Sequence, residues 1–196
     1  MRLSLLSPAT GLALDWETEV KGHLRLDDDV EKARVESVLV PSAMSWVEAE
    51  TNRALLTQTW KWLLDEFSCG PVDIPKPPLG SLESIKYVDV DGVQQTWDPA
   101  EYVVEVPAGP HALPGRLWPA FGKTYPYARC QPDAVEITFQ CGYGAAFSDV
   151  PAQLRSGMLL IVGELFERRE EAIAGTIISE VPLAARALVR PFRVGV

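Results

Sequence analysis

Three arginines near the end of the chain have the type and spacing of a docking surface. Arg186, Arg190 and Arg193 follow one another at steps of four and three residues, which places them on one face of a helix. The chain around them is acidic, with a formal net charge of −9. We expect this basic strip to bind a partner rather than to catalyse a reaction. The alternative is that the arginines only complement the C-terminal end of their own helix dipole.

A second candidate surface lies on the helix predicted from Pro151 onward. Its apolar residues form one stripe that neighbouring apolar residues widen; the stripe is Leu154, Met158, Ile161 and Leu165, and the residues beside it are Leu159, Val162 and Phe166. An apolar cover this wide exceeds what a surface helix needs to pack on its own core. We therefore predict that Met158, Ile161, Leu165 and Phe166 contribute to an interface between subunits.

The residue types that usually carry catalysis form no recognisable constellation. His23 and His111 have no cysteine or carboxylate at a metal-ligand spacing. The chain contains no GxSxG, Walker A, HExxH or GxGxxG pattern. Cys141 precedes two glycines of a tight turn, but it also ends an alternating apolar run, so packing is favoured over a nucleophilic role. The sequence thus indicates no catalytic residue, no metal site and no cofactor.

Acidic and aromatic clusters receive structural interpretations as well. The run from Asp27 to Asp29 lacks the glycine and distal glutamate of a calcium loop, so helix capping is favoured over cation binding. Asp28 and Glu31 have the spacing of a capping box. Of the six tryptophans, Trp60 and Trp62 alternate as in a strand, which favours core packing over a platform for sugars.

Composition bounds the class of protein. A chain of 196 residues with 47% hydrophobic residues is long enough for one domain with a sizeable core. Its acidic charge argues against binding nucleic acid through phosphates. No stretch approaches the ~20 apolar residues of a membrane span, and the apolar run within residues 1–6 is too short for a signal peptide. Cysteines at 69, 130 and 141 have no CxxC spacing, which suits reduced thiols.

Helices at both ends of the chain must position these residues. Asp15 is the predicted N-cap of a first helix that runs to about Leu24. A second helix is predicted from Val30 to Arg53. Pro41 falls inside it, so we expect a kink or a break near Ser37. Helix returns at Pro151, and a last helix begins near Pro182.

Between the helices the apolar period changes to two, which indicates strands. The first predicted strand begins at Thr57. The others, in chain order, are 84–90, 93–97, 102–106, 116–118 and 135–141. Asp91 and Gly92 predict a two-residue hairpin turn, and the proline-rich residues 70–79 predict an extended connection. The expected fold is therefore α+β: a helical body of residues 15–53 and 151–191 with a β-rich insertion of residues 57–142, all within one domain of residues 1–196.

Several segments, in order along the chain, resemble the head–tail connector (adaptor) proteins of long-tailed bacteriophages and of phage-derived gene transfer agents. The segments are Leu14–Asp29, Glu48–Trp60, Ile74–Leu79 with Ile85–Gly92, Val150–Arg155 and Val181–Arg193. They extend from about residue 14 to 193, which is nearly the whole chain. Pro41 departs from the alanine-rich middle of the second helix in that family.

The resemblance implies a structural virion protein rather than an enzyme, folded as a helical bundle with a β-rich insertion. It implies a homo-oligomeric ring of about a dozen subunits below the portal, which extends the DNA channel and joins head to tail. DNA would pass through without sequence-specific binding, and acidic walls would avoid trapping it. The implied partners are the portal protein, met by Arg186, Arg190 and Arg193, and a neck stopper or tail-terminator protein. The implied location is the bacterial cytoplasm during assembly and then the neck of a phage or gene-transfer-agent particle.

Two alternatives stay open at this point. The chain fits a tail-completion or stopper protein of the neck, which binding to purified portal would separate from an adaptor. In a different class, it fits a small-molecule or sugar-processing enzyme built on the β-rich insertion with Asp98 or Glu101, although no convergent carboxylates show. Truncation after Val181 should leave the folded body intact while abolishing the attachment of tails to filled heads.

Overall fold

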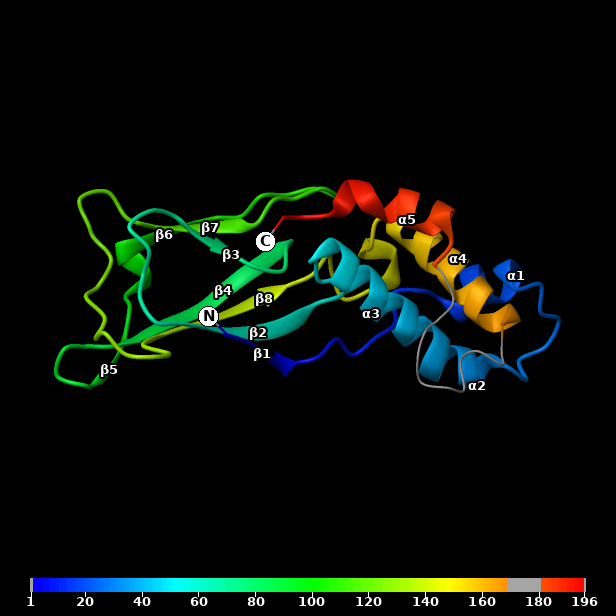
Figure 1. The fold of residues 1–196 in the computed structure, drawn as a ribbon, viewed down its shortest axis with the longest axis horizontal. Coiled ribbons are helices and arrows are strands. Elements are labelled where there is room, and N and C mark those ends of the chain that lie inside the picture. Colours follow the sequence, from blue (N-terminus) through cyan, green and yellow to red (C-terminus); the bar gives the residue numbers. More distant parts are fainter. Residues whose placement is uncertain (1, 169–180, 196) are drawn as a thin grey trace. The chain divides into compact units, whose positions relative to one another are not determined.

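The computed structural model describes residues 2–168 and 181–195 and divides into two compact units. We call them the β unit (Met1–Ala9 and Thr57–Tyr143) and the helical unit (Thr10–Leu56 and Gly144–Val196). The predicted α+β class is confirmed, since antiparallel sheets occupy the chain between its second helix and its C-terminal helices (Figure 1). Within the predicted range 151–191, residues 169–180 lie outside the described part.

The β unit contains two antiparallel sheets. The larger has the strand order β1-β2-β8-β4-β5 and the smaller the order β3-β7-β6. The strands are β1 (Arg2–Ser7), β2 (Gln58–Leu64), β3 (Val72–Ile74), β4 (Leu79–Val88), β5 (Gln94–Thr96), β6 (Tyr102–Glu105), β7 (Gly115–Pro119) and β8 (Val135–Cys141). Sequence analysis did not predict β1, whose short apolar run pairs with β2 as an edge strand.

Strand β8 is the centre of the larger sheet, and its sequence explains why. Its side chains alternate strictly between buried and half-buried, with Val135, Ile137, Phe139 and Cys141 facing inward. β2 pairs with it on one side and β4 on the other, as Figure 1 shows. The thiol of Cys141 is buried in this core, which agrees with the packing role predicted for it.

The hairpin of β4 and β5 forms as predicted, with Lys86 opposite Thr96, but its turn is longer than two residues. The N–H of Asp89 donates to the carbonyl of Val93 at 2.9 Å, which closes a three-residue loop. The carboxylate of Asp89 accepts the N–H groups of Asp91 and Val93, and Gly92 has φ +84°. Because the Asp89 carboxylate accepts these two N–H groups, the loop is more stable than Asp91 and Gly92 alone would make it.

The helical unit is built from short N-terminal turns and three longer helices. Its elements are η1 (Trp16–Val20), α1 (Lys21–His23), α2 (Lys32–Arg34), η2 (Val35–Leu39), α3 (Val40–Thr51), η4 (Phe147–Asp149), α4 (Ala152–Glu167), α5 (Leu183–Val189) and η6 (Arg190–Phe192). Helix α4 packs against both α3 and α5. The carboxylate of Asp15 accepts the N–H of Thr18 at 2.9 Å, so the predicted N-cap of the first helix is confirmed.

Pro41 does not break the second helix. The turn before it, η2, is a π turn in which the N–H of Val40 bonds to the carbonyl of Val35, and the helix continues into α3 with Pro41 in its first turn. A proline has no N–H and its ring crowds the preceding turn, and a widened turn at that place accommodates both effects. The irregularity near Ser37 was therefore predicted at the right place, but the break was wrong.

The predicted capping box of Asp28 and Glu31 is also wrong. The carboxylate of Asp28 accepts the N–H of Val30 at 3.2 Å, which is the bond of a local turn. Asp29 instead holds this segment, because one of its oxygens accepts both the indole N–H of Trp16 at 3.0 Å and the ammonium of Lys21 at 2.8 Å. The acidic run thus has the structural role expected, through a different residue.

Candidate functional site

The three arginines lie on the exposed side of the chain's last helical segment. Arg186 is in the last turn of α5, Arg190 begins the 3₁₀ turn η6, and Arg193 follows that turn with an extended backbone. All three side chains are exposed. The structure therefore brings them together on one short segment, although the helix ends before Arg193.

The other side of the same segment belongs to the core of the helical unit. Ala185, Val189 and Phe192 are fully buried, and α5 packs closely on α4 at Gly157, where an added Cβ would lie 2.9 Å from Val189 Cγ2. Burying a phenylalanine and a valine in this way contributes roughly 1.5–3 kcal/mol each. The terminal helix is thus part of the core of the helical unit, and its burial argues against the expectation that the chain stays folded without it.

A set of hydrogen bonds clamps the segment after α5 to the end of α3. Nε of Arg53 donates to the carbonyl of Phe192 at 2.6 Å, and Nδ2 of Asn52 donates to the carbonyl of Val194 at 3.0 Å. The N–H of Val194 returns a bond to the carbonyl of Thr51. Arg53 is only 2% exposed, so this bond is shielded from water, where a charge-assisted bond is strongest.

The ion pairs of the exposed arginines are weak by comparison. Arg193 lies 3.7 Å from a carboxylate oxygen of Glu50, with its side chain 63% exposed. An ion pair with this N–O distance and this solvent exposure contributes about 0–1 kcal/mol to stability. The guanidinium of Arg193 is therefore able to exchange Glu50 for an acceptor on a partner at little cost.

The four apolar residues predicted for a subunit interface separate into two kinds. Met158 and Ile161 are buried inside the helical unit, so their side chains contribute to its own core. Leu165 and Phe166 are half-buried near the C-terminal end of α4. Leu165 and Phe166 are therefore the two positions whose side chains keep exposed surface for contact with a second molecule.

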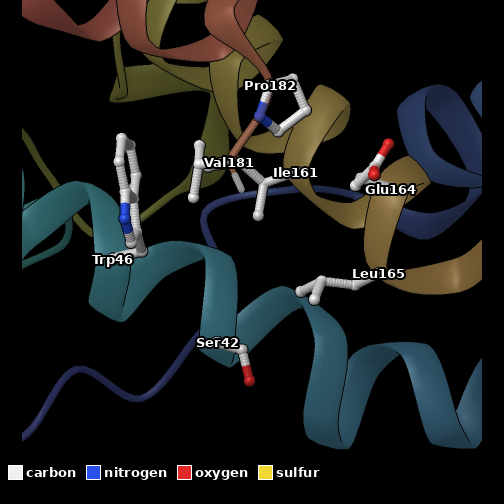
Figure 2. A pocket seen from close by; sticks show the side chains of 7 residues that line it. All are labelled: Ser42, Trp46, Ile161, Glu164, Leu165, Val181 and Pro182. Carbon is white, nitrogen blue, oxygen red and sulfur yellow. The ribbon is translucent and has the colours of Figure 1, made fainter. Parts of the chain in front are cut away.

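Leu165 also lines an apolar groove between α3 and α4 (Figure 2). The groove is open to solvent on one side, and its lining residues are Ser42, Trp46, Ile161, Glu164, Leu165, Val181 and Pro182. Figure 2 shows Trp46 on α3 and Ile161 on α4 lying on either side of the hollow. Sequence reasoning missed this groove, because its residues come from three separate segments of the chain.

The carboxylates considered for an enzyme have structural partners. Asp98 accepts the N–H of Ala100 at 2.9 Å as a helix cap, and Glu101 pairs with Lys123 at 3.0 Å. Four aromatic residues of the β unit, Phe67, Trp97, Tyr102 and Tyr125, pack against one another, and burial raises the pKa of both tyrosines. This cluster is a small core of the β unit, and its tryptophan, Trp97, is only 2% exposed.

The described residues contain no metal-binding group of three His, Cys, Asp or Glu side chains. His23 lies against Gly163 of α4, near enough that a Cβ there would come within 3.2 Å of its Nε2. No described helix is long and apolar enough to cross a membrane.

Comparison with known proteins finds likeness to solved structures alone. No protein-family model matches the chain, and no curated protein does. A chain from a structure described as the neck of an empty GTA particle, computed with C6 symmetry, matches with a TM-score of 0.76 and 27% identity. A chain from the virion of a native gene transfer agent (GTA) particle matches with a TM-score of 0.75, also at 27% identity.

A further match, to a chain from the neck of a native GTA particle computed with C12 symmetry, has a TM-score of 0.71 and 22% identity, which supports the fold alone. Each match covers 100% of this chain and 97% of the other. The likeness therefore includes both units and leaves no part of either protein as an unmatched domain. Over its full length, this chain is similar to structural components of gene-transfer-agent particles, including components of their necks.

Proposed function

We propose that this chain is a structural component of the particle neck, and more specifically a head–tail connector (adaptor) subunit. The observation that carries the proposal is the full-length likeness, at 27% identity, to a chain of a GTA neck. This likeness covers both units of the chain, since it includes 100% of this chain and 97% of the other. The absence of any catalytic arrangement among the described residues supports a structural role, since function is argued from sites rather than from fold alone.

The neck role suggests a homo-oligomeric ring. Necks of similar particles were computed with C6 and C12 symmetry, and cyclic symmetry repeats one subunit around an axis. We propose a ring of about a dozen copies that surrounds the DNA channel, with Leu165 and Phe166 near a subunit contact. The net charge of −9 would keep DNA from binding to the channel wall.

The arginine face is the proposed contact with the portal protein. Arg186, Arg190 and Arg193 are exposed, while Val189 and Phe192 on the other side anchor the segment in the core. Such anchoring holds the guanidinium groups in place before binding, which reduces the entropy lost on association. Carboxylates and carbonyl oxygens of the portal are suitable acceptors.

A charge-reversal experiment tests the portal contact. The variant with Arg186, Arg190 and Arg193 all changed to Glu should fold, because all three side chains are exposed, and should lose binding to purified portal. The matched control reverses Arg25, Arg116 and Arg129, which are also exposed and change the net charge equally. Equal portal binding by both variants would show that the terminal arginines serve only their own helix end.

The same assay separates the two neck roles. An adaptor binds purified portal directly, whereas a stopper requires another neck protein between them. Loss of the chain during assembly should leave DNA-filled heads without tails in either role, which electron microscopy of the lysate would show. Complete, tailed particles formed without the chain would contradict the neck proposal itself.

A further inference from the structure

Strand β1 is attached to its sheet by backbone pairing and has no buried side chain of its own. It lies at the edge of the larger sheet beside β2 (Figure 1), with Arg2 opposite Leu63 and Leu5 opposite Trp60. None of its 6 residues is buried, and Leu5 and Leu6 are 44% and 49% exposed. The ladder of backbone hydrogen bonds to β2 is therefore the main attachment of this strand.

The side chains of β1 add little to that attachment. The guanidinium of Arg2 lies 2.8 Å from a carboxylate oxygen of Asp133, with the two side chains 66% and 38% exposed, and such a pair contributes about 0–1 kcal/mol. The register with β2 shifts between Leu5 and Ser7, which interrupts the ladder as a β-bulge does. Release of β1 therefore breaks backbone hydrogen bonds but removes no buried side chain of the strand from a core.

The chain after β1 is a short connection that is suited to act as a hinge. The segment of the β unit that contains β1 ends at Ala9, and the helical unit begins at Thr10. No residue from Ser7 to Leu12 is buried, whereas Ala13 is fully buried in the helical unit. The connection of residues 8–12 spans at most about 18 Å when extended. The hinge therefore lets β1 reach a second copy only if that copy is a direct neighbour.

We propose that neighbouring copies of this chain exchange β1, so that β1 of one copy pairs with β2 of the next. The proposal rests on the ring of the proposed function. The edge of β2 already fits this strand in sequence and register, so exchange needs no complementarity beyond the pairing within one chain. In a closed ring every copy donates one strand and receives one, and no edge of β2 stays vacant.

The balance between the two arrangements depends on concentration, because exchange replaces each hydrogen bond with an identical one. The short connection keeps β1 near its own β2 at an effective concentration of roughly millimolar order, which favours pairing within one chain when the protein is dilute. Neighbours in a ring provide a similar local concentration. Pro8 fixes its own φ and biases Ser7 toward an extended backbone, and an extended connection suits the longer path to a neighbour. Exchange is therefore expected in the ring and not in dilute solution.

Cysteines at one paired position of β1 and β2 test the exchange directly. Ser4 lies opposite Lys61, and the separation of paired residues in antiparallel strands suits a disulfide. In a background with the exposed Cys69 and Cys130 changed to Ser, one protein carries Ser4→Cys and the other Lys61→Cys. Mixed at about 1 mM under mild oxidation, the two proteins should form a disulfide-linked pair of unlike chains. No such pair, or an equal yield of linked pairs with Ser4→Cys alone, would overturn the proposal.

A disulfide within one chain tests whether assembly depends on the exchange. A protein with both Ser4→Cys and Lys61→Cys, oxidised while dilute, keeps β1 on its own β2. This oxidised form should need about tenfold more protein to assemble than the same protein after reduction, as sedimentation would measure. The two forms share one sequence, so the lost ion pair of Lys61 with Glu136 affects both equally. Equal assembly of the two forms would contradict the exchange. Both experiments use the purified chain alone, so their failure would refute the exchange and leave the neck role to the test on particles.

Discussion

At the scale of single residues, Arg53 explains how an exposed arginine face is kept in place. Its buried guanidinium donates a hydrogen bond to the backbone carbonyl of Phe192, so it fixes the path of the chain between α5 and the C-terminus. This role could not be predicted from the sequence, because an arginine after a helix is usually solvated. Arg53 therefore has a structural role, unlike the exposed Arg186, Arg190 and Arg193.

Arg53→Met should destabilise the protein by about 2 kcal/mol, because it keeps the apolar stem but leaves the Phe192 carbonyl without this charged donor. Urea denaturation followed by circular dichroism measures the change. The control Arg190→Met, at an exposed position, should stay within about 0.5 kcal/mol of the parent protein. An unchanged stability for Arg53→Met would mean that the clamp does not hold the terminal segment.

Asp15 gives a prediction about acid stability. Hydrogen bonds from the backbone and side chain of Thr18 lower the pKa of its carboxyl group. A lowered pKa in the folded state stabilises the fold above the unfolded pKa of about 3.9, and this contribution is lost as the pH falls through the folded value. Asp15→Ala should cost about 1 kcal/mol at neutral pH and should flatten the acid limb of stability against pH.

Asp15→Asn is the informative control, since asparagine is also a good N-cap but carries no charge. It should retain most of the stability at neutral pH and lose the same part of the pH dependence. Denaturation curves collected from neutral pH down to acid would compare the three proteins. An acid limb in Asp15→Asn as steep as in the parent would show that another group is responsible.

At the scale of elements, the close approach of α4 and α5 sets the position of the terminal segment. Gly157 allows it, because its missing side chain leaves room for Val189. Gly157→Val should cost roughly 1–3 kcal/mol by forcing the helices apart. Gly22→Val is the matched control, since a Cβ at Gly22 meets nothing within 4 Å. Thermal unfolding of both variants gives the comparison, and a tolerated Gly157→Val would mean that the packing adapts.

Truncation after Val181 should unfold the helical unit rather than leave it intact. It removes the buried side chains of Ala185, Val189 and Phe192 and leaves apolar residues of α4 open to water. The loss of burial from the two larger side chains alone is several kcal/mol, which is comparable with the whole stability of a domain. Loss of helical circular dichroism and a rise in aggregation would be seen; a soluble, folded product would contradict the assignment of α5 to the core.

The elements that sequence reasoning predicted well are those with strong local patterns. β8 alternates over seven residues, and the caps at Asp15 and Pro182 fall where helices begin. The elements it missed depend on distant partners. β1 exists through pairing with β2, the groove collects residues from three segments, and the π turn at η2 is a response to Pro41 that only the packed helix reveals.

At the scale of the whole molecule, the sequence again indicated only the surface whose residues are neighbours along the chain. The basic strip was visible because its three residues are close in sequence, and the exposure of Arg186, Arg190 and Arg193 agrees with a surface role. The exposure of Phe121 could not be predicted, because nothing in a short apolar segment says which side chain a turn directs away from the core. The exposed apolar surface of this protein therefore could be identified only from its three-dimensional structure.

The central claim is that the chain is a ring-forming component of a particle neck. Cryo-electron microscopy of particles assembled with this chain, averaged with cyclic symmetry about the tail axis, tests it most directly. We expect a closed ring of this chain directly below the portal, with α5 and its arginines against portal density. A neck resolved to side chains that contains no copy of this fold, or places it only away from the portal, would contradict the account.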